Sequence, residues 1–143
     1  MLQRVDFYIL NSHQDQDRWR ILSTLLGRQW LKGHRFHIHC RDQNECAELD
    51  SFLWQSDITD FLPHHRLDTE FAGDSPITLG HPQSWPEKRD ILVNFDLHLP
   101  EAMHSFERVL EIVVQDPVWL DAQRDHYRQF KKMGLTPQIH KLG

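Results

Sequence analysis

Histidine is the residue type in this sequence that most directly suggests chemistry, with eleven copies in 143 residues. Three of them, His34, His37 and His39, lie close together in the chain. In an extended strand, His37 and His39 point to one face, roughly 6 to 7 Å apart, and with a third donor they could bind zinc. The alternative is a pair of half-exposed histidines on an edge strand. Because no third and fourth ligands follow at a fixed spacing, we expect no metal site, and a zinc-dependent hydrolase is the minor alternative.

The patterns of other catalytic or cofactor sites are missing from the sequence. A dinucleotide site needs glycines after the first strand, but residues 11–15 (NSHQD) contain none. Neither a G-x-x-x-x-G-K-[ST] phosphate loop nor a G-x-S-x-G nucleophile elbow occurs. The carboxylate pairs fit surface charge better than acid–base machinery: Asp57 with Asp60, and Glu107 with Glu111. We therefore predict no catalytic residues, no cofactor and no intrinsic enzymatic activity.

A basic stripe near the C-terminal end is the clearest candidate for a binding surface. Spacings of i, i+3, i+4 and i+7 on a helix place four side chains on one face: Arg124, Tyr127, Arg128 and Lys131. Residues 117–143 hold five basic and two acidic side chains, against 11 and 19 in residues 1–116. A basic stripe beside an aromatic ring can hold an acidic peptide or the phosphates of nucleic acid. A solvated helix face is the structural alternative.

A second candidate surface consists of large apolar residues near the middle of the chain. Trp54 stands at the end of a predicted helix, and Phe61 opens the irregular segment FLPH (61–64). Such groups are either core plugs or parts of an exposed patch. From the residues alone, we favour core plugs.

Strands and helices alternate in the elements that must position these residues. Apolar periodicity predicts strands over 4–10, 35–40, 77–79, 90–95 and 108–114, and helices over 15–31, 42–54 and 116–133. The strand at 90–95 is expected to be central, because its apolar run is continuous. Asp42 and Glu45 form a capping box, and Gly134 suits a helix C-cap. In the last helix, one stripe is expected to face the core: Trp119, Ala122, His126, Phe130 and Met133.

The element order favours one α/β domain over residues 1–143, with a mostly parallel central sheet and helices on both faces. This is a three-layer, Rossmann-like topology without a nucleotide site. The chain has no run of about 18 apolar residues and no signal-peptide pattern at its start. Its two cysteines, Cys40 and Cys46, are expected to be thiols packed as small hydrophobes, as in a cytoplasmic protein.

Several short segments carry a resemblance to a known family. They are FYIL (7–10), W-x-x-G (30–33), C-x-D (40–42), LDSFLW (49–54), FLPH (61–64), KRDILVNF (88–95) and HYRQFKKMG (126–134). In this order, over nearly the whole chain, the sequence resembles the chi subunit family of bacterial DNA polymerase III. The resemblance implies a non-catalytic adaptor of the clamp loader complex in DNA replication. Its implied partners are the psi subunit and the acidic C-terminal tail of single-stranded DNA-binding protein (SSB).

The resemblance also assigns residues to these two partners. The family's tail-binding positions match Arg124, Tyr127 and Arg128, which we extend to Lys131 of the same stripe, and its psi-facing aromatics match Trp54 and Phe61. Because of this match, we expect Trp54 and Phe61 to be exposed rather than to fill the core. A helicase is a further candidate partner for this surface. The alternative function is direct binding of single-stranded nucleic acid by the basic helix, against which the acidic body of the chain argues.

Overall fold

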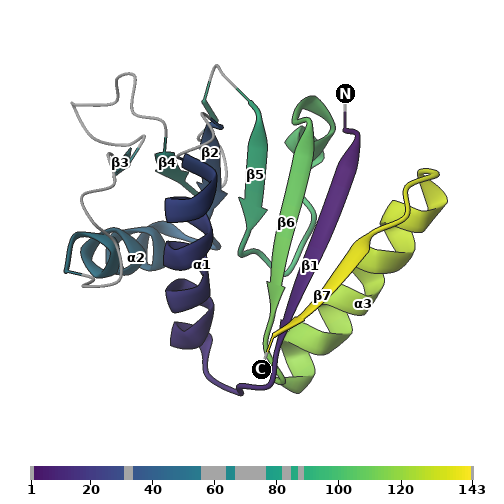
Figure 1. Cartoon of the computed structure of the whole chain (residues 1–143), viewed down its shortest axis with the longest axis horizontal. Coiled ribbons are helices and arrows are strands. Elements are labelled where there is room, and N and C mark those ends of the chain that lie inside the picture. Colours follow the sequence, from purple (N-terminus) through teal and green to yellow (C-terminus); the bar gives the residue numbers. More distant parts are fainter. Residues whose placement is uncertain are drawn as a thin grey trace.

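The protein, described here from a computed structural model, is an α/β sheet domain with helices on both faces (Figure 1). The structure describes residues 2–30, 34–55, 64–66, 77–81, 85–86 and 89–142. The strands are β1 (Arg4–Leu10), β2 (Phe36–His39), β3 (His64–Arg66), β4 (Ile77–Gly80), β5 (Ile91–Asn94), β6 (Arg108–Val113) and β7 (Gln138–Leu142). The helices are α1 (Asp15–Trp30), α2 (Gln43–Gln55), the 3-10 turn η1 (Glu101–Ser105) and α3 (Pro117–Lys132).

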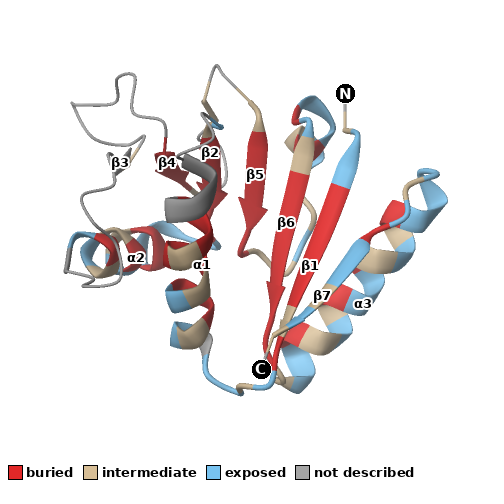
Figure 2. Cartoon of the chain, in the orientation of Figure 1, coloured by how far each residue is buried: buried red, intermediate tan, exposed pale blue. Residues whose placement is uncertain are grey.

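The sheet has seven strands in the order β3-β4-β2-β5-β6-β1-β7, and all its strand pairs in the described residues are parallel. The expectation of a mostly parallel sheet is therefore confirmed. The strand predicted over 90–95 is β5, which occupies the middle position as expected from its apolar run. Parallel strands with covered faces are buried on both sides, and the central strands in Figure 2 are accordingly buried.

Alternation along each strand divides the core into two clusters, one on each face of the sheet. From β1, Tyr8 and Leu10 pack with residues of α1 and α2, whereas Val5 and Phe7 pack with Phe130 of α3 and with η1. The predicted layers, with helices on both faces, are confirmed. Within the described residues, none of the helices is long and apolar enough to cross a membrane.

Three elements were not predicted from the sequence: β3, η1 and β7. The two missed strands are the outermost in the sheet. Edge strands bury less side-chain surface, so their apolar pattern is weak; in β7 no residue is fully buried. Both cysteines are buried thiols, as expected.

Candidate functional site

Helix α3, which carries the predicted basic stripe, is fixed at both ends by its own sequence. The Asp116 carboxylate accepts from two backbone N–H groups of the first turn, at 3.1 and 3.2 Å, and Pro117 follows it. At the other end, Gly134 has a φ of 85°, and the Leu135 N–H donates to the Phe130 carbonyl at 3.1 Å. This is a Schellman motif, which needs a residue that tolerates positive φ. The predicted bounds of the helix are confirmed to within one residue.

The inner face of α3 packs against the sheet. The predicted core-facing stripe is confirmed for three members: Trp119, His126 and Phe130. It is wrong for Met133, which is exposed at the C-cap of the helix. Gln123, which was not predicted to face the core, is buried and donates to the Ile112 carbonyl at 3.2 Å.

His126 joins α3 to the sheet through a buried ion pair. Its Nδ1 lies 2.9 Å from both carboxylate oxygens of Glu111, and its Nε2 lies 2.8 Å from the Leu97 carbonyl oxygen. Burial lowers the pKa of His126, but the hydrogen bond and charge of Glu111, with the Leu97 carbonyl, outweigh it and raise the pKa overall. The interpretation of Glu111 as surface charge is wrong, because this residue is completely buried.

The outer face of α3 presents the predicted basic stripe. Arg124, Arg128 and Lys131 are exposed, and this side of α3 is largely pale blue in Figure 2. Tyr127 is half-buried, and its ring meets the Phe7 ring edge-on, with centroids 5.8 Å apart. The structure therefore brings three cations together on one surface and holds the tyrosine ring against the core.

Two depressions lie along the start of this outer face, and both include Val118, whose surface is 61% exposed. The first is lined by Pro117, Val118, Leu120, Asp121 and Arg124. The second is lined by Leu97, His98, Val118, Asp121, Ala122, Asp125 and Arg128. Arg128 pairs with Asp125 at 3.7 Å, but both side chains are more than half exposed, so this pair is weak. Each depression therefore combines the exposed Val118 and Asp121 with one arginine.

Hydrogen bonds tie together the loops after β1 and β6, at the sheet edge where α/β folds often bind nucleotides. The Gln115 N–H donates to the Ser12 carbonyl at 2.7 Å, and the Gln115 side chain donates to the Leu10 carbonyl at 2.9 Å. His13 Nδ1 lies 2.6 Å from the Gln115 carbonyl oxygen. These hydrogen bonds hold the loops after β1 and β6 against each other.

The histidine pair on β2 is buried, so its interpretation as half-exposed edge residues is wrong. β2 lies between β4 and β5, and His37 and His39 are each 1% exposed. His37 Nδ1 bonds the Thr78 hydroxyl at 2.8 Å, and the Trp85 ring stacks on His39 with centroids 4.8 Å apart. Burial, followed by the charges of His39 and Arg89, lowers the pKa of His37 to about 3. Within the described residues, which include exposed His34, no three His, Cys, Asp or Glu side chains are grouped to hold a metal.

Comparison with known proteins decides the family of this chain. The sequence model of the family described as "DNA polymerase III chi subunit, HolC" matches residues 2–138. The chain belongs to the DNA polymerase III chi subunit family. The predicted resemblance is confirmed, and this chi-family chain is a replication accessory subunit.

Named relatives agree with this assignment, and a solved structure shares the fold. The DNA polymerase III subunit chi of Pseudomonas aeruginosa is 32% identical over 141 residues, covering 99% of this chain and 98% of the relative. Those of Haemophilus influenzae and Escherichia coli are 26% and 23% identical, covering 100% and 95% of their own lengths. The solved C-terminal domain of the DEAD-box protein Dbp5 has a TM-score of 0.58 at 11% identity, covering 96% of this chain and 90% of that one. This last likeness shows the fold alone.

Trp54, the second candidate site of this chi-family chain, lies at the end of α2. Its surface is 53% exposed, so the residue-based expectation of a core plug is wrong for Trp54. Helix α2 buries Leu49 and Leu53 on its inner face, and Trp54 follows on the next, outward position. Phe61, together with Asp57 and Asp60, lies outside the described residues.

Arg18 is a buried residue that sequence reasoning missed. Its guanidinium lies 4.2 Å from the centroid of the Trp119 ring and 4.8 Å from that of Phe95, and its Nη2 is 3.9 Å from Glu45 Oε2. It is completely buried, although a helix arginine ordinarily faces solvent. The only local signal is its position next to Trp19 on the apolar side of α1, which is too weak to predict a buried cation.

Proposed function

We propose that this chi-family chain is a non-catalytic adaptor that binds the acidic C-terminal tail of SSB along α3 and the psi subunit around Trp54. The observation that carries the tail site is the pair of exposed arginines, Arg124 and Arg128, each of which lines a depression that also includes the exposed Val118. Membership of the chi subunit family supports the role in replication. The binding of the SSB tail and of the psi subunit is our proposal.

The chemistry of the α3 surface suits a peptide that is acidic and ends in an apolar residue. Arg124 and Arg128 supply planar groups of donors for carboxylates, including a terminal carboxylate. Val118 and Leu120 offer apolar surface for the last side chain. Lys131, one turn beyond Arg128, extends the positive charge toward the acidic part of the tail.

Tyr127 has a supporting role in this proposal. Its ring packs edge-on against Phe7 and lines neither of the two depressions around Val118. It therefore packs α3 against β1, and the half-buried ring belongs to the same stripe as the two arginines. The contact is small, so we expect affinity in the micromolar range, weakening with salt.

The proposed psi surface rests on Trp54. Trp54 lies at a helix end and is 53% exposed, so a partner could bury a large apolar surface on it. Tryptophans of this kind are typical anchors of protein interfaces. Phe61 belongs to this proposal through the family match only. A Trp54→Ala variant should lose psi binding and keep tail binding, since α2 and α3 lie at different parts of the fold (Figure 1).

Calorimetric titration with a peptide ending in Asp-Asp-Ile-Pro-Phe, at low and moderate salt, tests the tail site. We expect micromolar binding that weakens roughly tenfold or more in Arg128→Ala, since a charge-assisted contact contributes about 1.5–3 kcal/mol. Lys132→Ala, on the same helix but outside the stripe, is the matched control and should bind as the unmodified protein does.

Two results would count against the tail site. Unchanged affinity in Arg128→Ala would remove Arg128 from it. Tight binding of single-stranded DNA with no partner present, with a steep salt dependence, would instead favour the direct nucleic-acid function.

A further inference from the structure

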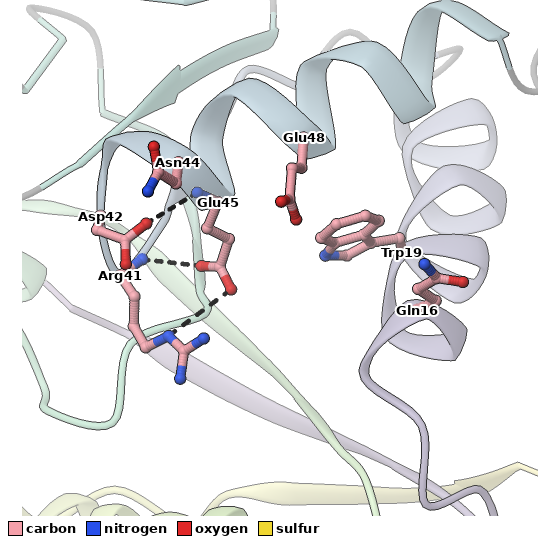
Figure 3. A pocket seen from close by; sticks show the side chains of 7 residues that line it. All are labelled: Gln16, Trp19, Arg41, Asp42, Asn44, Glu45 and Glu48. Carbon is pink, nitrogen blue, oxygen red and sulfur yellow. Dashed lines mark hydrogen bonds and ion pairs between the residues drawn. The ribbon is translucent and has the colours of Figure 1, made fainter.

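A cavity of about 310 Å³ lies between α1 and the start of α2. We call it the α1–α2 pocket; its lining is Gln16, Trp19, Arg41, Asp42, Asn44, Glu45 and Glu48. Figure 3 shows Trp19 and Gln16 reaching in from α1, opposite the side chains of α2. Glu48, the lining residue of α2 nearest to Trp54, is six residues before it, or about 9 Å along the helix axis. The pocket is therefore separate from the proposed psi surface.

Trp19 brings an unused hydrogen-bond donor to this pocket. The residue is 8% exposed, and its indole Nε1 is buried with no hydrogen-bond partner in the described part of the chain. In Figure 3 this nitrogen faces across the pocket toward Arg41 and Glu45. A buried donor without an acceptor is costly, so an occupant with an acceptor oxygen would gain from this N–H.

Two backbone donors around the α2 N-terminus are already used, so they are not available to an anion in the pocket. Asp42 Oδ1 accepts from the Glu45 N–H at 2.8 Å, and Glu45 Oε1 accepts from the Arg41 N–H at 2.8 Å. The predicted capping box is thus present, although Glu45 reaches the residue before the N-cap. The Arg41 guanidinium lies over the Trp119 ring at 5.5 Å and within 3.9 Å of Glu45 Oε2.

The remaining charge in the pocket is negative. Three carboxylates line it, and Arg41 is its single cation. Glu48 is exposed, its carboxylate points toward Trp19 in Figure 3, and it has no ion pair among the described residues. Burial raises the pKa of Glu45, and the Arg41 hydrogen bond and the charges of Arg18 and Arg41 offset this only in part. A cation bound in the pocket would stabilise the charged form of Glu45 and so offset the remaining effect of burial on its pKa.

We propose that the α1–α2 pocket binds a basic side chain of a partner protein. The carboxylates of Glu48 and Glu45 face the cation, and Trp19 Nε1–H donates to the peptide carbonyl beside it. The surrounding charge fits such a partner, because residues 1–116 hold 19 acidic and 11 basic side chains. The inference does not depend on the α3 or Trp54 proposals.

The test follows the indole N–H signal of Trp19 in the ¹⁵N-labelled full chain by NMR. The signal is assigned through contacts with the Phe52 ring, whose centroid lies 5.6 Å from that of Trp19. The probe is acetyl-Gly-Arg-Gly-amide, compared with its citrulline and glutamate counterparts, which replace the guanidinium by a neutral isostere and by an anion. We expect a saturable shift with the arginine peptide only.

Two variants locate the binding. Glu48→Gln, at an exposed position, should weaken the arginine peptide roughly three- to tenfold. Glu101→Gln, an exposed carboxylate on η1, is the matched control and should leave binding unchanged. A shift with the glutamate peptide or inorganic phosphate, no shift with any probe, or equal weakening in both variants would each overturn the proposal.

Discussion

Arg108 Nε donates to Asp6 Oδ2 at 2.8 Å, joining the side chains of β6 and β1 across the sheet. Arg4 and His140 bond the same carboxylate, the latter at 2.8 Å from Oδ1, so Asp6 is the shared anion of three basic side chains. Asp6 is completely buried, whereas its three partners are partly exposed. Burial raises the pKa of Asp6, but Arg4, His140 and Arg108 together outweigh it and lower the pKa.

We predict that Asp6→Asn destabilises the fold by about 2–3 kcal/mol at neutral pH, because Arg4, Arg108 and His140 lose the anionic acceptor that they share, although all three keep some access to water. The lowered pKa sets the sign: the contribution of Asp6 is present above its unfolded pKa and is lost as the pH falls through the lower folded value. Urea unfolding at pH 7 and in acid measures this. Asp125→Asn, on the exposed side of α3, should cost much less; equal losses would contradict the assignment.

For His126, we predict a contribution to stability that decreases as the pH rises. Because the folded pKa is raised, the ion pair with Glu111 is fully present below the unfolded pKa and is lost as the pH passes the folded one. His126→Gln should therefore cost about 2–4 kcal/mol near pH 6 and less at high pH. Denaturant unfolding over this range tests it.

The ring signals of His126 give an independent check on this ion pair. Their NMR titration should yield a pKa above 6.5, the ordinary value for histidine. Glu111→Gln removes the carboxylate, so it should bring the His126 pKa down and abolish the pH dependence. A midpoint below 6.5 in the unmodified protein would mean that the ion pair does not form.

His37 has the opposite effect on stability in acid. Its pKa of about 3 means that the folded protein resists protonation, whereas the unfolded chain takes up a proton near pH 6.5. Stability should fall as the pH drops between these values, by up to about 1.4 kcal/mol per pH unit from this residue. His37→Gln, which keeps a polar group near Thr78, should flatten this slope. Ile38→Val should lower stability by about 1 kcal/mol without altering the slope.

The cap of α3 should be separable from the proposed tail site. Asp116→Ala leaves two backbone N–H groups of the first turn without an acceptor, so we expect a loss of about 1 kcal/mol in thermal or urea unfolding. Arg124→Ala, at an exposed position in the same helix, should change stability by less than about 0.5 kcal/mol. If the two substitutions cost the same, the Asp116 cap does not stabilise the helix as described.

Local sequence patterns predicted the helices and strands that bury a regularly spaced row of apolar side chains. The strand over 90–95, the helix over 116–133 and its C-cap at Gly134 follow from residues within a few positions of each other. β3 and β7 were missed because edge strands carry little apolar alternation. The i, i+3, i+4, i+7 stripe on α3 was likewise visible, because helix periodicity alone determines which side chains share a face.

The sequence by itself determined the α/β class, the α3 stripe and the family, since periodicity, capping residues and ordered motifs are all local or linear signals. Only the tertiary structure decided which polar residues are buried and what they contact. The partners Glu111 and His126 lie 15 positions apart, and His37 is buried only because β4 and β5 flank its strand. Such contacts depend on strand order and on how helices cross the sheet, which no local pattern encodes. The buried donor of Trp19 likewise emerges only where α1 meets α2.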